Sequence, residues 1–366
     1  MNTRLLYFDH TTLDEKENLA LPGMRKFEYF YRIYSNGVMF LDRTGTIQSP
    51  MRTKSLFPIP QMRSMPQSYE ELCNERAREL LERAERLDVD MYVFWSGGID
   101  STCVLVSLLK NATSEQKKRI VVVMSEYSVQ ENPNFYRDHV HGKLRTEPGV
   151  MAPYLLFGGN HLIVNGEHND QLFGSDMVAR LIGKYGESAI QKPYARETIQ
   201  ALYADITKDA AMADFYMNIF ERLKGAAPIS ISTNHDFLWW INFCLKWQLV
   251  HFFVWSYAGP RAVGHINDAY LKERYAPFYS TEQFQLWSMN NLDKRIKDTW
   301  KSYKWVCKDV IYEYTKDADY RDNKTKFGSR FHLLINQFPY QTIDEHYGFH
   351  RSPLLAPYHE PKNDFL

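Results

Sequence analysis

Short apolar segments alternate with helical segments along residues 91–185, and this order limits the fold more than any other feature of the chain. Met91–Trp95 and His161–Asn165 are short apolar runs, and Arg119–Met124 is a β-branched run without alternation, which predicts a strand buried on both faces. Strands that alternate with helices predict an α/β fold with a doubly wound parallel sheet. The helical segments are Ile99–Lys110, Asn134–Leu144 and Asp170–Tyr185.

The segments on either side of this core differ from it in pattern. Residues 1–65 are predicted to form a small, partly β N-terminal element, with alternation through Tyr31–Leu41. Ser68 and Glu71 have the spacing of a capping box and open an amphipathic helix to about Leu87. Residues 190–315 are largely helical in pattern. We therefore expect a main domain over 66–330 with a mostly helical C-terminal lobe, and a tail over 331–366 that packs on it.

The composition excludes little but favours a cytosolic protein. The chain has 366 residues, with 44 Lys and Arg against 44 Asp and Glu, so no overall field indicates nucleic acid or membrane. The four cysteines are far apart, as free buried thiols of a reducing compartment are. Phe237–Gly259 is apolar, but a central Lys246 costs roughly 3 kcal/mol in a bilayer. We interpret this segment as buried helix of a soluble protein.

A polar turn follows the first predicted strand. Ser96-Gly97-Gly98-Ile99-Asp100-Ser101 stands between the strand and an apolar helix. The glycines let the backbone approach a ligand, and the N–H groups at a helix start favour an anion. Hydroxyls of Ser96, Ser101 and Thr102 are further donors, so the turn predicts a phosphate site.

Asp100 would repel a phosphate unless a cation lies between them. Mg²⁺ takes one or two carboxylates together with phosphate oxygens, so Asp100 in this turn predicts a magnesium nucleotide. The alternative is a helix N-terminus with ordinary polar caps. The Gly-Lys-Ser/Thr of a Walker loop is absent from this turn, which excludes a P-loop of that type.

The string Ser96–Ser101 resembles the S-G-G-x-D-S loop of the N-type ATP pyrophosphatases. That family includes asparagine, GMP, NAD and argininosuccinate synthetases and tRNA-modifying enzymes. The resemblance implies an adenine nucleotide alpha hydrolase-like sheet. It also implies cleavage of ATP between the α and β phosphates, with AMP transferred to a substrate oxygen.

A second stretch, Leu162–Asp176, is similar to the S-G-E-G-x-D-E-L-F-G-G segment of asparagine and β-lactam synthetases. By this resemblance Asp100 and Asp170 would hold Mg²⁺, and Glu167 would orient or deprotonate the nucleophile. Asp170 as a simple helix N-cap is the alternative. His168 stands where the family has its second glycine, Gln171 where it has the glutamate after the aspartate, and Ser280 where it has the aspartate of a P-F-L-D segment. These departures put L-aspartate as the acceptor in doubt.

A third stretch, Arg321–Ser329, resembles the family pattern K-x-G-F-G, with Lys324 three residues before Phe327. The resemblance assigns Lys324 to the stabilisation of the departing pyrophosphate, as oxyanion stabilisers act generally. A solvated loop lysine is the alternative interpretation, and Lys326 is the second candidate. Resemblance also places adenine against a set of residues at the strand ends. These are Phe94, Trp95, Val123, Met124, Ser125 and Gly166.

Together these features predict an ATP-dependent ligase that adenylates a carboxylate or amide oxygen and transfers ammonia or an amine to it. ATP and Mg²⁺ are the expected cofactors, and a small molecule or nucleotide is the expected acceptor. Glutamine-dependent relatives carry a nucleophilic cysteine after Met1, whereas this chain has Asn2, so nitrogen would come from free ammonia, an amine or a separate glutaminase. Nucleobase modification by amidation or thiolation, and a non-catalytic ATP-binding module, are the alternatives.

Overall fold

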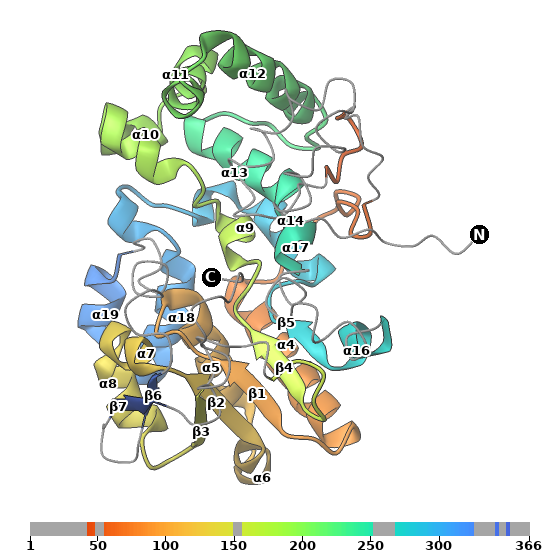
Figure 1. Ribbon diagram of the computed structural model, residues 1–366, viewed down its shortest axis with the longest axis vertical. Helices are drawn as coiled ribbons and strands as arrows, with labels where there is room; N and C mark the ends of the chain where they lie inside the picture. The colour runs from red at the N-terminus through yellow and green to blue at the C-terminus, as the bar shows by residue number, and fades with distance from the viewer. Residues whose placement is uncertain are drawn as a thin grey trace. The chain divides into compact units, whose positions relative to one another are not determined.

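The computed structural model describes residues 42–47, 55–148, 156–251, 268–325, 341–343 and 349–351 (Figure 1). The chain divides into two compact units. We call Met65–Asn169, Val254–Trp287 and Asp293–Leu366 the sheet unit, and Met1–Ser64, Asp170–Phe253 and Ser288–Leu292 the helical unit. The predicted hairpin at Tyr31–Leu41 lies outside the described residues, and the division expected at residues 65 and 330 stays a prediction.

The sheet unit contains five parallel strands in the order β3-β2-β1-β4-β5, so the protein is of the α/β class. Val93 of the central strand is paired with Val122 on one side and Val164 on the other. The three predicted strands are therefore confirmed. The strand bounds are β1 Met91–Phe94, β2 Ile120–Met124, β3 Arg145–Pro148, β4 Leu162–Asn165 and β5 Tyr275–Pro277.

Both edge strands were absent from the sequence prediction. β3 carries Arg145, Thr146 and Glu147, so it lacks the apolar run that identifies β2, whose five residues are all buried. β5 has three residues and lies more than a hundred positions after β4 in the chain. Each edge strand ends at a proline, Pro148 in β3 and Pro277 in β5.

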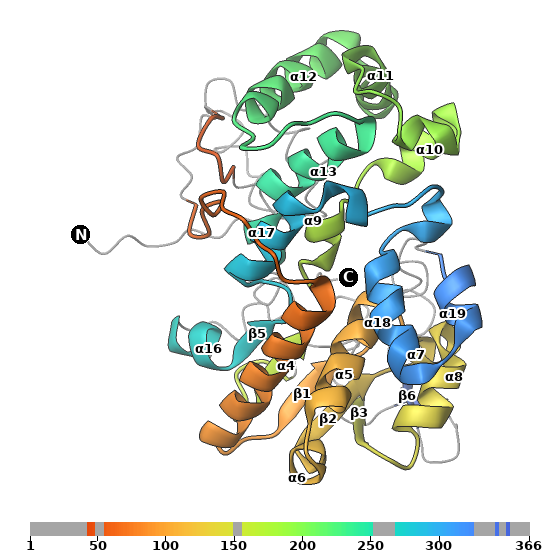
Figure 2. The same cartoon turned by 180° about the vertical axis from the view of Figure 1, so that it is seen from behind.

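Helices α4 and α5 pack on one another and cover one face of the sheet, as Figure 2 shows. The capping box is confirmed, because Ser68 accepts from the Glu71 backbone N–H and Glu71 accepts from that of Ser68. Helix α18 also packs on α5. The helices of this unit are α4 Tyr69–Arg86, α5 Ile99–Asn111, α6 Ser114–Lys118, α7 Glu126–Glu131, α8 Pro133–Phe135, the π-helical turn η1 Tyr136–Val140, α16 Asp268–Glu273, the 3₁₀ turn η6 Trp300–Ser302, α18 Trp305–Thr315 and α19 Ala318–Asn323.

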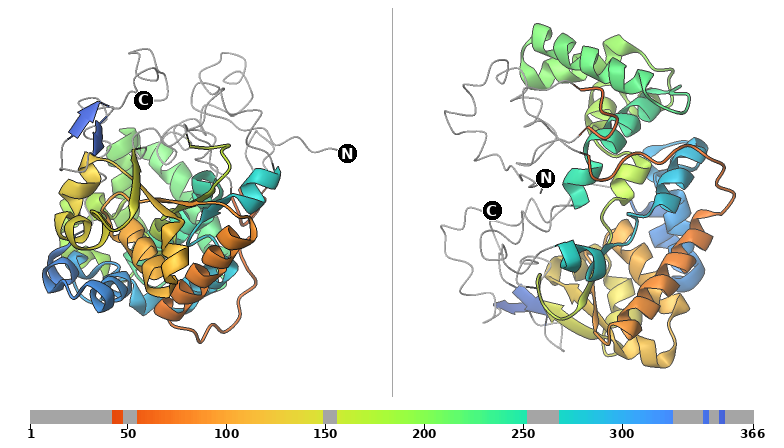
Figure 3. Two further views of the ribbon diagram at one scale, coloured as in Figure 1. Left: turned by 90° about the horizontal axis from the view of Figure 1, so that it is seen from below. Right: turned by 90° about the vertical axis from the view of Figure 1, so that its right-hand side faces the viewer.

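A short antiparallel pair lies beside β3, apart from the main sheet (Figure 3). Its strands are β6 Gln341–Ile343 and β7 Phe349–Arg351. The rest of the predicted tail lies outside the described residues.

The helical unit contains the apolar segment that the sequence analysis assigned to buried helix. All twelve residues of α13 (Asn234–Leu245) are buried, which confirms that assignment for Phe237–Leu245, and a turn at Lys246 separates α13 from the next helix. In the described part of the chain, no helix combines the length and apolar character needed to cross a bilayer. The other helices here are α10 Val178–Tyr185, the 3₁₀ turn η3 Glu187–Ile190, α11 Arg196–Thr207, α12 Ala210–Gly225 and α14 Trp247–His251.

The single helix predicted for Asp170–Tyr185 is wrong, because the segment forms α9 (Asn169–Phe173) and then α10. Gly174 ends the first helix with φ +74°, and Met177 has φ +64°. A Cβ at Gly174 would lie 2.6 Å from the Cβ of Trp239, so close packing on α13 requires glycine there. Residues of both units occur in α9, in α17 (Glu282–Asn290) and in the 3₁₀ turn η5 (Leu292–Lys294).

Candidate functional site

The site begins at the point where the strand order of the sheet reverses. β1 and β4 are neighbours, β2 and β3 lie beyond β1, and β5 lies beyond β4. Open α/β sheets bind ligands at the carboxyl ends of the strands at such a switch point. The Ser96–Ser101 turn follows β1, and Gly166-Glu167 follows β4. A Cβ on Gly166 would lie 3.0 Å from Ser101 N, so the two connections touch through their backbones.

The turn after β1 is built from hydroxyl groups and glycines. The Ser101 Oγ accepts from Ser96 N at 3.0 Å and lies 3.0 Å from Ser96 Oγ. Gly97 has φ +78°, and a Cβ there would lie 2.3 Å from the carbonyl oxygen of Ser128. Gly98 is the N-cap of α5 and provides no side-chain hydrogen bond to its first turn. The start of α5 therefore suits an anion that takes the place of a capping side chain.

Several side chains that were predicted to contact the ligand are directed into the core. Thr102 is fully buried, and its Oγ1 accepts from Trp95 Nε1 at 3.0 Å. Its hydroxyl is thus directed into the core, which leaves Ser96 and Ser101 as the hydroxyls of the turn. Trp95, Met124 and Ser125 are also buried, so a nucleotide at this edge would meet their backbone atoms more readily than their side chains.

Asp100 is held by a buried polar network. Its Oδ1 accepts from Lys304 Nζ at 2.5 Å and from Asn169 Nδ2 at 2.6 Å. The Lys304 side chain has no exposed surface, whereas that of Asp100 is 17% exposed. Asn169 in turn accepts from the hydroxyl of Tyr69 at 2.8 Å, and Asp100 O accepts from Tyr279 at 3.0 Å. The carboxylate is therefore fixed in orientation by Lys304 and Asn169.

Lys304 was missed by sequence reasoning. It lies 204 positions after Asp100, at the N-cap of α18, with φ +60°. The segment Lys301-Ser302-Tyr303-Lys304-Trp305 alternates basic and aromatic residues, and no local pattern tells which lysine turns inward. Its position in the apolar start of a helix that packs on α5 was the one usable signal.

Lys324 lies beside the same turn. Its Nζ forms an ion pair with the Glu131 carboxylate and donates to Glu131 O at 3.1 Å. The Glu131 side chain is packed against Gly97, where an added Cβ would lie 2.8 Å from Glu131 Cβ. Tyr320, one turn before Lys324 on α19, donates to Gly97 O at 3.3 Å. Burial raises the pKa of Tyr320, so this hydroxyl stays a donor. Lys326 lies outside the described residues.

The two carboxylates after β4 lie in different units. Glu167 is half-buried, and its backbone N–H donates to Asn165 Oδ1 at 3.1 Å. Asp170 belongs to the helical unit, where its carbonyl oxygen accepts from Gly174 N at 2.8 Å. The shared magnesium site of Asp100 and Asp170 stays a prediction. His168 is buried with φ +74°, a conformation that favours the glycine expected there.

Side chains of the types that bind metal ions do not form a cluster within the described residues. No group of three or more His, Cys, Asp or Glu in this part of the chain is arranged to hold a metal ion. All four cysteines are free and buried, as predicted. Burial raises the pKa of Cys307, so the thiol next to Lys304 in the helix start is neutral.

In comparisons with known proteins, no family model and no curated protein matches the chain.

Proposed function

We propose that the protein is a cytosolic ATP-dependent ligase that forms an amide-like bond and releases AMP and pyrophosphate. The observation that carries this proposal is the pair of connections at the switch point, where the Ser96–Ser101 turn and Gly166-Glu167 meet backbone to backbone. A glycine-rich turn at a helix N-terminus binds phosphate, and a carboxylate across from it can act on a nucleophile. Two lysines near this turn, Lys304 and Lys324, add positive charge.

The reaction requires charge stabilisation at two moments. An acceptor oxygen attacks the α-phosphorus, the bond to the β-phosphate oxygen breaks, and pyrophosphate leaves with the electron pair. Ser96, Gly97 and the start of α5 would hold the β and γ phosphates. Lys324 would stabilise the departing charge, after it exchanges its contact with Glu131 for a contact with phosphate. The amine then attacks the adenylated carbon, AMP leaves, and Glu167 accepts the amine proton.

Magnesium is part of this proposal as a companion of ATP. When bound, Mg²⁺ would neutralise phosphate charge and orient the triphosphate. Asp100 is already engaged by Lys304 and Asn169, and the described residues hold no cluster of carboxylates around it. Phosphate oxygens and water would therefore provide most of the magnesium ligands, with Asp100 as the proposed protein ligand in the sheet unit. ATP should bind weakly without the metal.

The proposal is tested by product analysis with radiolabelled ATP, ammonium and pooled acceptors, namely amino acids, nucleotides and tRNA. AMP and pyrophosphate released only with one pool would support the ligase and name its acceptor class. Nucleotide or tRNA dependence would select the modification of a nucleobase. Tight ATP binding without AMP from any pool would identify a binding module, and ADP with orthophosphate would contradict the proposal. Glutamine should not replace ammonium.

A further inference from the structure

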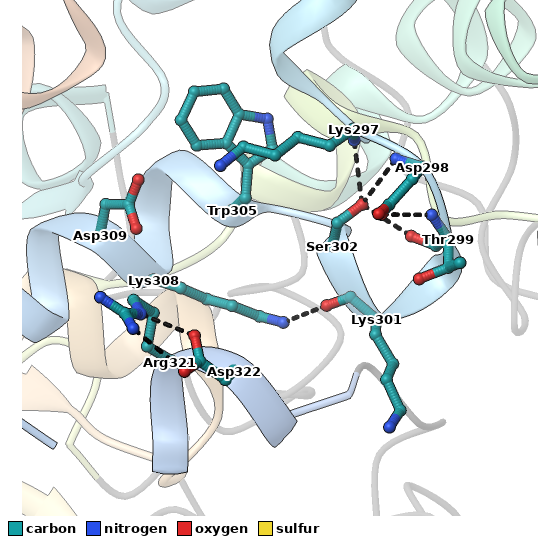
Figure 4. Close-up of a pocket in the computed structure, with 10 residues that line it drawn as sticks. All are labelled: Lys297, Asp298, Thr299, Lys301, Ser302, Trp305, Lys308, Asp309, Arg321 and Asp322. Carbon is teal, nitrogen blue, oxygen red and sulfur yellow. Dashed lines mark hydrogen bonds and ion pairs between the residues drawn. The ribbon is translucent and has the colours of Figure 1, made fainter. Parts of the chain in front are cut away.

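A second pocket of about 400 Å³ lies in the sheet unit between η6, the first turns of α18, and α19 (Figure 4). Its volume is within the range of small-molecule sites. The pocket is lined by four basic side chains, three carboxylates, two hydroxyl residues and one indole. These are Lys297, Lys301, Lys308, Arg321, Asp298, Asp309, Asp322, Thr299, Ser302 and Trp305.

The chain segment that forms most of this pocket is rich in basic and aromatic residues, and Asp293 and Asp309 flank it. Lys294–Lys308 contains six Lys and Arg residues and one Asp, together with Trp300, Tyr303 and Trp305. The whole chain, in contrast, has equal numbers of basic and acidic residues. Basic residues interleaved with aromatic ones are typical of surfaces that bind nucleotides in strands. The lining of the pocket itself is nearly balanced, with four basic side chains and three carboxylates, so an anion would be held by individual contacts and not by an overall positive field.

The upper wall of the pocket in Figure 4 combines a cation with a buried donor. Lys297 runs along the Trp305 indole, with its Nζ 3.9 Å from the ring centroid. Trp305 Nε1 is buried, and it has no hydrogen-bond acceptor within the described residues. A buried donor without an acceptor costs about 1–3 kcal/mol. An anion bound beside Lys297 would provide that acceptor.

The floor of the pocket is a buried lysine. Lys308 is 2% exposed, and its Nζ reaches across to the carbonyl oxygen of Lys301 at 2.5 Å (Figure 4). Burial lowers the pKa of Lys308 to about 8, so its ammonium is poorly solvated. An ammonium group has three donors. A bound anion would both accept from this group and restore part of the lost solvation.

The carboxylates of the pocket are not equivalent. Asp322 is paired with Arg321, with N–O distances of 2.7 and 3.0 Å, and Asp298 accepts from Thr299 N at 2.6 Å. Asp309 is half-buried, its pKa is raised by burial, and none of the described residues donates a hydrogen bond to it. It can accept from a ligand hydroxyl or amino group. The pocket thus has an anion-binding wall and floor and a separate acceptor.

We propose that this pocket binds the phosphate and sugar of a nucleotide, either free or within a single strand. The phosphate would lie between Lys297 and Lys308 and accept from Trp305 Nε1, and a sugar hydroxyl would donate to Asp309. None of the residues that line this pocket belongs to the ATP turn, and the proposal does not depend on the ligase chemistry proposed above. Because Trp305 directly follows Lys304, a ligand here would also fix the helix start that carries the partner of Asp100.

The test measures binding of labelled oligouridylate, whose sugars keep a 2′-hydroxyl within the strand, by fluorescence anisotropy and of uridine monophosphate by calorimetry, using the full chain. Lys297→Met is the main variant, because Lys297 is exposed and its loss leaves the core intact. Lys308→Met is the second variant. Lys118→Met removes an exposed lysine from α6, paired only with Glu115 among the described residues, and is the matched control.

Each pocket variant should weaken binding about tenfold or more, as loss of one charge-assisted contact does. In a plot of log affinity for the oligonucleotide against log salt concentration, the slope should fall by about one for each lysine removed. Lys118→Met should match the parent. If Lys297→Met weakened binding of the oligonucleotide alone, the phosphate would belong to a single strand. If it weakened binding of the monophosphate alone, the phosphate would belong to a free nucleotide. Parent-like affinity of Lys297→Met for both probes, or no binding of either, would overturn the proposal.

Discussion

Replacing Asp100 with asparagine should destabilise the protein as well as stop its chemistry. Asn keeps the shape of the side chain and its contact with Asn169, but it removes the charge that faces Lys304 Nζ at 2.5 Å. Breaking a buried ion pair from one side costs about 3–5 kcal/mol, whereas exposed pairs contribute about 0–1 kcal/mol. The lysine here is fully buried and the aspartate is 17% exposed, so we expect a loss of about 2–3 kcal/mol.

A double-mutant cycle isolates this interaction from other effects of each substitution. Asp100→Asn, Lys304→Met and the double variant are compared by urea unfolding followed by near-ultraviolet circular dichroism. The double variant should recover part of the stability lost in each single one, with a coupling energy of about 1.5–3 kcal/mol. The coupling should change little between low and high salt, because a buried pair is poorly screened.

The control cycle uses an exposed ion pair between α5, the helix of Asp100, and α4. Lys110 at the end of α5 forms an ion pair with Glu70, and the two side chains are 37% and 42% exposed. Its coupling energy should stay below about 1 kcal/mol. If the coupling of Asp100 with Lys304 were no larger than that of Lys110 with Glu70, the inference that burial strengthens this pair would be refuted.

Three further predictions follow from the turn and from the second pocket. Gly97→Ala should lower the free energy of unfolding in urea by about 3 kcal/mol or more, because the added Cβ would lie 2.3 Å from a backbone oxygen. Gly142→Ala, at φ +66° with open space around it, should lower it by about 1 kcal/mol. Equal losses for the two variants would contradict the packing argument. Lys324→Ala should lower kcat by roughly 10²-fold with little change in ATP affinity. Glu131→Gln, which alters the partner of Lys324, should change kcat far less. A near-normal kcat for Lys324→Ala would exclude a catalytic role for Lys324. The pKa of Lys308 is lowered from 10.5 to about 8, so between pH 8 and pH 10.5 the unfolded chain binds more protons than the folded one. The stability of the parent relative to Lys308→Met should therefore rise from pH 8 to pH 10.5. A stability difference that does not change with pH would refute this prediction.

The central part of the fold could be predicted because local signals agree there. The capping box at Ser68, the unbroken apolar run of β2 and the double glycine before α5 each fix one boundary. The edge strand β3 could not be predicted, because its Arg-Thr-Glu sequence resembles a loop. Only its pairing with β2 makes it a strand. The break after α9 was missed because the requirement at Gly174 arises from Trp239, distant in sequence.

The candidate site was predicted in its turns but not in its partners. Ser96–Ser101 and Gly166-Glu167 are short motifs whose chemistry can be read locally, and the sheet order places them side by side. Lys304 and Glu131 have no such motif. Each acquires its role from tertiary contacts, with Asp100 and Lys324 respectively, and those depend on packing of α18 and α19 that no local pattern encodes.

The prolines that end both edge strands bear on how copies of this protein can meet. Edge strands offer unpaired N–H and C=O groups to any other chain, and proline removes one donor from that row. Here the outer strands have four and three residues and end at Pro148 and Pro277. A neighbouring molecule that approached either edge would therefore find a short row of donors that ends at a proline. Addition of a strand from another molecule is thereby disfavoured at both edges.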